Sequence, residues 1–193
     1  DFHGYDQLYY ELLAKLIGPG RIIVSSAGND GARNSYIHKN IGKERAGAFI
    51  MGNEKRFSCT AKSKQTFTFR VSVYDNVASP QIVDISTVNV CNAQDSLLTD
   101  SLLVGGKKYI WRVLAYPNSY DTSETAYDFQ ISSPSKLGDS PQVSLQVMGR
   151  DADIELYRMS GYMFPHSLDP VLDAGDCRYT IFSPSSSPDV ICV

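Results

Sequence analysis

Several features that mark large classes of protein are missing from this sequence. No apolar run approaches the roughly 18–20 residues that a membrane-spanning helix needs. Residues 1–4 lack the basic and apolar regions of a signal peptide, so any such signal is expected to lie outside the chain. Basic residues are not in excess, because 18 lysines and arginines face 21 acids and the net charge is −3. Neither a membrane-spanning segment nor a nucleic-acid partner is therefore expected.

Metal-binding patterns are also missing. Cys59, Cys91, Cys177 and Cys192 include no C-x-x-C pair, so a zinc site is not expected. Cys192 lies in an apolar run and is predicted to be a small core residue, while a disulfide among the other three is left open. The histidines are not expected to form a site either, because they are predicted at the terminus and in polar loops: His3, His38 and His166. Acid-rich loops can bind calcium, but the nearby acids match no EF-hand spacing: Asp169, Asp173 and Asp176.

The N-terminal stretch predicts one helix followed by one buried strand. Residues 6–17 place apolar side chains at helical spacing, with Asp6 as the predicted N-cap. Glycine and proline at positions 18–20 end that helix. An apolar run from Arg21 then passes into small residues and a Gly-Asn-Asp-Gly turn. This pattern is typical of a parallel strand in an α/β sheet, and it places Asn29 at the carboxyl end of the strand, where sites of such sheets lie.

The middle of the chain alternates apolar and polar residues, which predicts strands. We expect roughly eight, at residues 46–51, 67–73, 81–88, 102–104, 107–116, 127–131, 143–147 and 154–156. Gly105 and Gly106 predict a hairpin turn. Tyr109, Trp111 and Val113 are predicted to share an inward face. No second helical pattern is visible, so the fold class is mainly β, a jelly roll or β-sandwich.

Three segments are predicted to connect the regular elements. Residues 32–45 are polar and are predicted to form a loop, and residues 160–178 are irregular and acidic. Residues 179–188 are rich in turn residues, and an apolar run of residues 189–193 follows. That run resembles a strand cut off in its middle, so the chain is expected to be a piece of a longer protein.

The two ends of the chain carry a family resemblance. Residues 22–31, Ile-Ile-Val-Ser-Ser-Ala-Gly-Asn-Asp-Gly, resemble the strand and turn that carry the oxyanion asparagine of subtilisin-like serine proteases. Residues 183–193 resemble the proline-containing turn and core strand that follow in that family. Clostridial germination proteases of the family carry a jelly-roll insertion between the oxyanion asparagine and the catalytic serine, and the order of this chain is similar to theirs.

The resemblance implies a division of the chain and a role for three residues. Residues 1–31 would supply a subtilase-like helix and oxyanion strand, residues 32–178 the insertion, and residues 179–193 the connector and the next core strand. Asn29 would be the oxyanion donor, and Gly28 and Ser26 would form the strand-end wall of the substrate cleft. The parent would cleave a peptide or protein substrate outside the cell, at the cell surface or in the periplasm, without a cofactor. The insertion would pack on the protease core or bind a partner.

The chain departs from the family in lacking the catalytic triad. The aspartate motif Asp-Ser/Thr-Gly, the histidine motif His-Gly-Thr-His and the serine motif Gly-Thr-Ser are all missing from the sequence. Residues 171–175, Val-Leu-Asp-Ala-Gly, resemble the aspartate motif only superficially, because they follow Asn29 and have no strand before them. The chain is therefore expected to be catalytically incomplete by itself.

Two alternatives remain open at this point. The chain could be a non-catalytic β-sandwich that binds a glycan or a protein, or it could belong to a pseudoprotease. Jelly rolls often bind sugars through aromatic side chains, and the middle of this chain is rich in them: Tyr109, Trp111, Tyr116, Tyr120, Tyr127 and Tyr157. The same residues also suit the interior of a sandwich, which is the interpretation that the alternation favours.

Overall fold

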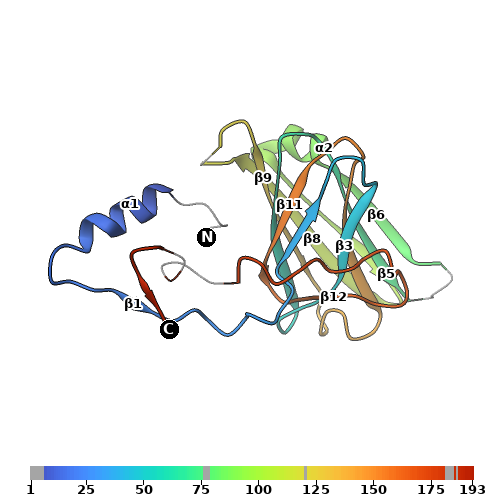
Figure 1. Ribbon diagram of the computed structural model, residues 1–193. Helices are drawn as coiled ribbons and strands as arrows, with labels where there is room; N and C mark the ends of the chain where they lie inside the picture. Colours follow the sequence, from blue (N-terminus) through green and yellow to red (C-terminus); the bar gives the residue numbers. More distant parts are fainter. Residues whose placement is uncertain (1–6, 76–78, 120, 181–184, 186) are drawn as a thin grey trace. The chain divides into compact units, whose positions relative to one another are not determined.

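The computed structural model describes residues 7–75, 79–119, 121–180, 185 and 187–193 (Figure 1). The chain falls into two compact units. The terminal unit comprises Asp1–Arg33 and Cys177–Val193, and the sandwich unit comprises Asn34–Asp176. Predicted residues Asp6, His3 and Tyr120 lie outside the described residues. No helix in the described ranges is long and apolar enough to cross a membrane.

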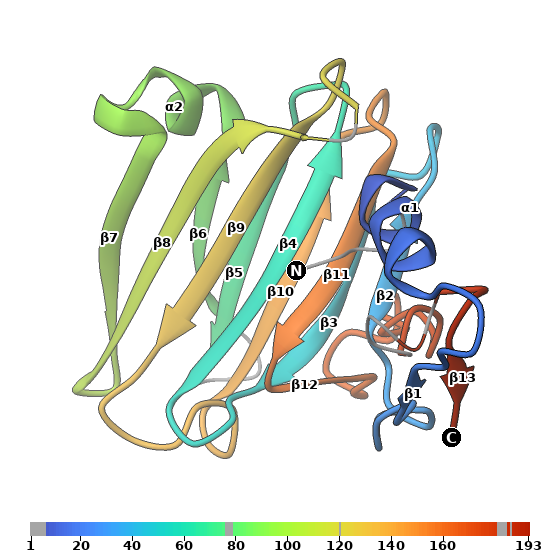
Figure 2. The same cartoon turned by 90° about the vertical axis from the view of Figure 1, so that its left-hand side faces the viewer.

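The sandwich unit consists of two antiparallel sheets (Figure 2). The five-stranded sheet has the order β12-β3-β10-β5-β6, with these bounds: β3 Arg45–Met51, β5 Thr68–Tyr74, β6 Gln81–Ser86, β10 Gln142–Met148 and β12 Tyr162–Phe164. The six-stranded sheet has the order β2-β11-β4-β9-β8-β7, with these bounds: β2 Tyr36–Lys39, β4 Arg56–Ser63, β7 Leu97–Val104, β8 Lys107–Pro117, β9 Thr125–Ser132 and β11 Ile154–Ser160. The mainly β sandwich predicted from the sequence is confirmed.

Aromatic side chains from both sheets meet in the core. Phe69 of β5 stacks on Phe129 of β9 with ring centroids 5.4 Å apart. The rings of Phe67 and Tyr127 lie edge-on to each other with centroids 5.2 Å apart, and the ring centroids of Phe67 and Phe69 are 4.9 Å apart. All four side chains are at most 4% exposed. Contacts of this kind join the two sheets through one continuous apolar interior.

The two ends of the sandwich unit are hydrogen-bonded to each other. The amide of Ser35 donates to the Asp176 carbonyl at 2.8 Å, and the amide of Asp176 donates to the Tyr36 carbonyl at 2.9 Å. The segment before Asp176 is also fixed to β3, because Arg45 of that strand donates two hydrogen bonds to the Asp169 carboxylate at 2.6 and 3.1 Å. The unit therefore begins and ends at the same edge of its six-stranded sheet, beside β2.

Three local predictions were wrong. The polar stretch 32–45 contains strand β2, which pairs with β11, and so His38 lies on a strand and not in a loop. The stretch 81–88 is a strand only to Ser86 and then enters helix α2, Thr87–Asn92, which is followed by the short helix η1, Gln94–Ser96. The two sheets contain eleven strands in place of about eight, because β2, β4 and β12 were not recognised as strands.

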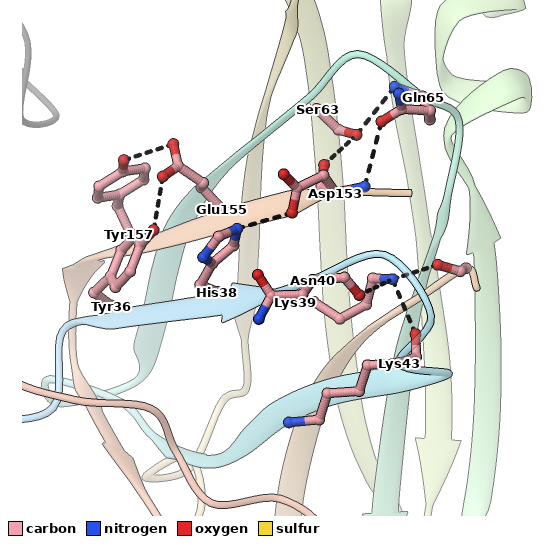
Figure 3. Close-up of polar contacts among 11 residues, drawn as sticks. Tyr36, His38, Lys39, Asn40, Lys43, Ser63, Gln65, Asp153, Glu155 and Tyr157 are labelled. Atoms are coloured by element: carbon pink, nitrogen blue, oxygen red, sulfur yellow. Dashed lines mark hydrogen bonds and ion pairs between the residues drawn. The ribbon is translucent and has the colours of Figure 1, made fainter. Parts of the chain in front are cut away.

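A buried lysine holds two turns of the sandwich together. The side chain of Lys39 at the end of β2 is fully buried, and its ammonium group donates to the carbonyls of Asn40 at 3.2 Å, Lys43 at 3.0 Å and Gly149 (Figure 3). Burial lowers the pKa of Lys39, and the nearby acids Asp153, Asp151 and Glu44 act in the opposite direction. The three carbonyls satisfy the donors of the ammonium group, which makes its burial tolerable.

We predict that Lys39→Met lowers the free energy of unfolding by about 3 kcal/mol, since it leaves three carbonyls without their donor. Lys43→Met is the matched control: that side chain is exposed, and its ammonium lies 3.9 Å from Asp173, so the expected loss is below about 0.5 kcal/mol. Urea titration of both variants measures the difference. Equal losses would show that the buried ammonium is not a structural group.

Candidate functional site

The candidate site lies at the end of a short parallel pair of strands in the terminal unit. Strand β1, Val24–Ser25, pairs in parallel with β13, Ile191–Cys192, with Val24 opposite Ile191. Three backbone hydrogen bonds join the pair. The amide of Ile191 donates to the Ile23 carbonyl at 3.0 Å, and the amide of Val193 donates to the Ser25 carbonyl at 3.0 Å. The amide of Ala27 donates to the Val193 carbonyl at 2.8 Å. Val24 and Ile191, which are 167 positions apart in sequence (191 − 24), thus become neighbours in one sheet.

The helix and the glycine turn before β1 agree with the sequence prediction, but the predicted buried strand does not: β1 has only two residues, and Val24 is 52% exposed. Helix α1, Gln7–Leu16, is followed by a turn in which the Arg21 amide donates to the Gly18 carbonyl at 3.0 Å. Gly20 has a φ of 78°, a value that glycine adopts without a steric penalty. Helix, glycine turn and parallel strand together form half of an α/β unit.

The three predicted site residues lie together where β1 ends. Gly28 has a φ of 90°, so the backbone turns sharply there, and Ser26, Gly28 and Asn29 are all exposed. None of the described residues forms a hydrogen bond with the Asn29 amide group, which therefore has both N–H donors free for a ligand as far as the described chain extends. The following turn is closed by Asp30, whose carboxylate binds Arg33 at 2.7 Å.

One residue at this strand end was not singled out from the sequence. The hydroxyl of Ser185 donates to the carbonyl of Ser26 at 2.7 Å, and its side chain is only 5% exposed. This bond fixes the backbone three residues before Asn29 from the opposite end of the chain. Ser185 belongs to a run of three serines before Pro188, and nothing in that run distinguishes the serine that makes this bond.

The described part of the terminal unit contains no histidine that could act as a base beside Asn29. A histidine–carboxylate pair does occur in the sandwich unit, where Nε2 of His38 lies 2.8 Å from Oδ1 of Asp153 (Figure 3). Ser63 is close to this pair, but its hydroxyl donates to the Asp153 backbone carbonyl at 2.7 Å and not to the imidazole. The pair therefore lacks the serine contact that nucleophilic catalysis requires.

The acidic loop and the thiols do not form a metal centre in the described ranges of the chain. No group of three or more histidine, cysteine, aspartate or glutamate side chains gathers there in a metal-binding arrangement. Asp169 is bound to Arg45, and Asp173 accepts a hydrogen bond from the Gly175 amide at 3.0 Å. All four cysteines are free thiols, and Cys192 is exposed, so its prediction as a core residue was wrong. Only Cys59 is buried, and burial raises the pKa of its thiol.

The aromatic residues considered for sugar binding are mostly interior. Trp111 is 5% exposed and lies in the core with Tyr109 and Val113, as the alternation predicts. Tyr127 is also buried, and burial raises its pKa to about 12, with the Cys91 thiol adding to the shift. A stacking platform for a sugar ring needs an exposed aromatic face, and these side chains do not provide one.

We predict that Ser185→Ala weakens the strand pair, because it removes a buried hydrogen bond of about 0.5–1.5 kcal/mol. Exchange of the Ala27 and Val193 amides should become about 2- to 12-fold faster, as measured by hydrogen exchange. Ser187→Ala is the control, since Ser187 is equally buried but its hydroxyl oxygen accepts a hydrogen bond from the Asp189 amide within the turn. If both variants exchange alike, Ser185 has no special role at the strand end.

Comparison with known proteins finds similarity among solved structures only. No protein-family model matches the chain, and no curated protein matches it. Among solved structures, the chain is similar to the CspB protease of Clostridium perfringens, with a TM-score of 0.58 and 14% sequence identity. The match covers 100% of this chain and 38% of the CspB chain. The chain thus shares its fold with a part of that protease and spans less than half of its length.

Proposed function

We propose that this chain is a segment of a subtilisin-like serine endopeptidase in which Asn29 is the oxyanion donor. In this proposal residues 1–31 and 179–193 belong to the protease core, and residues 32–178 are a β-sandwich inserted between them. The observation that supports the proposal most strongly is the parallel pairing of β1 with β13, since Asn29 follows two residues after Ala27, which forms the last backbone bond of this pair. The fold shared with a clostridial protease supports the same assignment.

The chemistry of Asn29 suits this role. Attack on a peptide carbonyl places negative charge on the carbonyl oxygen, and a fixed neutral N–H donor stabilises that charge without a proton transfer. An exposed asparagine amide at a strand end offers such a donor. Gly28, with its φ of 90°, turns the backbone without a side chain, so that a substrate can approach closely, and the exposed Ser26 would form part of the cleft wall.

Apolar side chains on the terminal unit fit a core that includes further strands and helices. Five are more than half exposed: Leu16 at 64%, Ile22 at 74%, Val24 at 52%, Ile191 at 51% and Val193 at 71%. Parallel sheets are normally covered on both faces, and a sheet of two strands is rarely stable alone. In the proposed parent these side chains would be covered by the rest of the protease core.

The proposed parent supplies the groups that this chain lacks. Its aspartate and histidine would precede Asn29 in sequence and its serine would follow residue 193, so acyl transfer would require no cofactor. Its substrate would be a peptide or protein, and its place of action would be outside the cytoplasm, as for the family that the sequence resembles. The β-sandwich would stiffen this enzyme or present a surface to a partner.

We expect a serine-directed fluorophosphonate probe to label a longer polypeptide that contains this chain and to leave residues 1–193 alone unlabelled. The reason is that the nucleophile and its base lie outside residues 1–193 in this proposal. Gel fluorescence after labelling measures both. Labelling of the isolated chain, or none of the longer polypeptide, would contradict the proposal.

In the longer polypeptide, Asn29→Ala should lower kcat for peptide hydrolysis by about 100- to 1,000-fold with little change in KM, a magnitude established on subtilisin itself for the loss of one oxyanion donor. Asn92→Ala is the control, because Asn92 is an exposed asparagine of helix α2 in the sandwich unit. It should leave kcat unchanged. An unaltered kcat in the Asn29 variant would remove Asn29 from the mechanism.

A further inference from the structure

The outer face of the β7–β8 hairpin exposes an unusual number of apolar side chains for a sheet surface. The pairing register places Leu97 opposite Leu114, Ser101 opposite Ile110 and Leu103 opposite Lys108 on this face. Its four apolar members are substantially exposed: Leu97 at 43%, Leu103 at 71%, Ile110 at 42% and Leu114 at 38%. Exposed apolar groups that gather in one place mark interaction sites more often than isolated ones do.

The same face is basic, although the chain as a whole is acidic. Lys108, Arg112 and Arg56 are exposed, and the register of β8, β9 and β4 aligns Arg56 with Ile110 through Ser132. None of these three cations forms an ion pair with a residue that the structure describes. We call this set of apolar and basic residues on β7, β8 and the start of β4 the basic outer face.

Acids on these strands are outnumbered by the cations of the basic outer face. The register places one acid on the same side of β7, β8 and β9, namely Asp128. Its carboxylate accepts hydrogen bonds from Thr60 at 2.5 Å and Tyr116 at 3.1 Å. Asp100 of β7 is opposite Trp111 and therefore lies on the inner side of the strand. No described residue forms an ion pair with Arg112 or Lys108, so their charge is available to an external carboxylate.

Strand β7 is also the edge of its sheet. It ends the order β2-β11-β4-β9-β8-β7, so β8 is its only strand neighbour among the described residues (Figure 2). An edge strand of eight residues offers backbone donors and acceptors that an extended peptide can bind. The Ser101 amide already donates to the Asp100 carboxylate at 2.7 Å, and an added strand would replace this bond. Two copies of this chain joined edge to edge would bring two basic faces and two Asp100 side chains together, so the charges disfavour a second copy as the occupant.

We propose that β7 and the basic outer face bind an extended segment of an acidic partner protein, which adds to the six-stranded sheet as a further strand. The segment would alternate carboxylates, facing Arg112 and Lys108, with apolar residues that continue the inner side formed by Leu98 and Leu102. A neutral residue is required opposite Asp100. This proposal goes beyond the peptidase assignment and does not depend on it.

The geometry of the face suits this alternation. An added strand would lie about 4.8 Å beyond β7 and twice that distance from β8. The side chain of Arg112 must therefore extend across β7, and the residue opposite it is Thr99, which is short enough to let it pass. Leu97 and Leu103 flank that passage and can contact the methylene groups of glutamate side chains in the added strand.

The test uses three fluorescein-labelled peptides and the full chain of 193 residues, with binding measured by fluorescence anisotropy. The probe is Thr-Glu-Val-Glu-Val-Glu-Thr, which we expect to bind saturably and more weakly as salt is raised. In Thr-Lys-Val-Lys-Val-Lys-Thr the charge is reversed, and in Thr-Glu-Pro-Glu-Pro-Glu-Thr the prolines remove backbone donors. Neither of these two peptides should bind. Equal binding of the proline peptide would contradict strand addition, and no binding of the probe would overturn the proposal.

Charge reversal on the protein locates the site. Arg112→Glu should weaken binding of the probe at least about tenfold, since one attraction is lost and one repulsion is gained. Arg150→Glu is the matched control, because Arg150 is also exposed but lies in the turn after β10. The Arg150→Glu chain should bind the probe as the unaltered chain does. Arg112→Gln should give a smaller loss than Arg112→Glu. Equal losses of affinity in the Arg112→Glu and Arg150→Glu chains would contradict the proposed site, because binding of the probe would then depend only on the net charge of the protein.

Vesicles of equal parts phosphatidylserine and phosphatidylcholine distinguish a membrane from a protein partner. The proposal expects little sedimentation of the chain with these vesicles at physiological salt. Vesicle binding that Arg112→Glu abolishes, together with no binding of the glutamate peptide, would overturn the proposal in favour of an anionic membrane surface. Thermal melting of each variant checks that the sandwich is intact.

Discussion

Parallel pairing of β1 with β13 is the constraint on which the arrangement of the chain depends. Two parallel strands cannot be joined by a tight turn and need a long crossover connection. Here residues 26–190 form that connection, and most of them build a sandwich with its own core. This is possible because the sandwich unit begins and ends at one place, where Ser35 and Tyr36 exchange hydrogen bonds with Asp176. The insertion can therefore fold as a unit while the strands that it separates remain paired.

The sequence predicted the parts of the fold that are determined by local patterns. The hairpin at Gly105 and Gly106 joins β7 and β8 as expected, since two glycines permit the positive φ values of 55° and 74° that occur there. The inward face of Tyr109, Trp111 and Val113 followed from a period of two residues. The exposure of Asn29 at the end of β1 agrees with a strand-end residue, although its role as an oxyanion donor remains a proposal.

Long-range contacts account for what the sequence could not predict. The sequence predicts Lys39 in a loop, but its side chain is buried, and its ammonium group donates a hydrogen bond to a carbonyl 110 residues away, at Gly149. The segment after Ser86 contains β-branched residues typical of a strand, but it forms α2 between β6 of one sheet and β7 of the other, so tertiary context overrides propensity. Ser185 could not be chosen from a run of serines, and only the strand register shows that Arg112 lies on the outer face of β8.

The coding sequence that flanks this chain tests the central claim most directly. If the parallel pair belongs to a subtilisin-like protease, an Asp-Ser/Thr-Gly motif and a His-Gly-Thr-His motif should be encoded upstream, and a Gly-Thr-Ser motif downstream. That order would place Asn29 between the histidine and the serine. Flanking sequence without any of these motifs would contradict the account, because the strand end would then have no catalytic groups to serve.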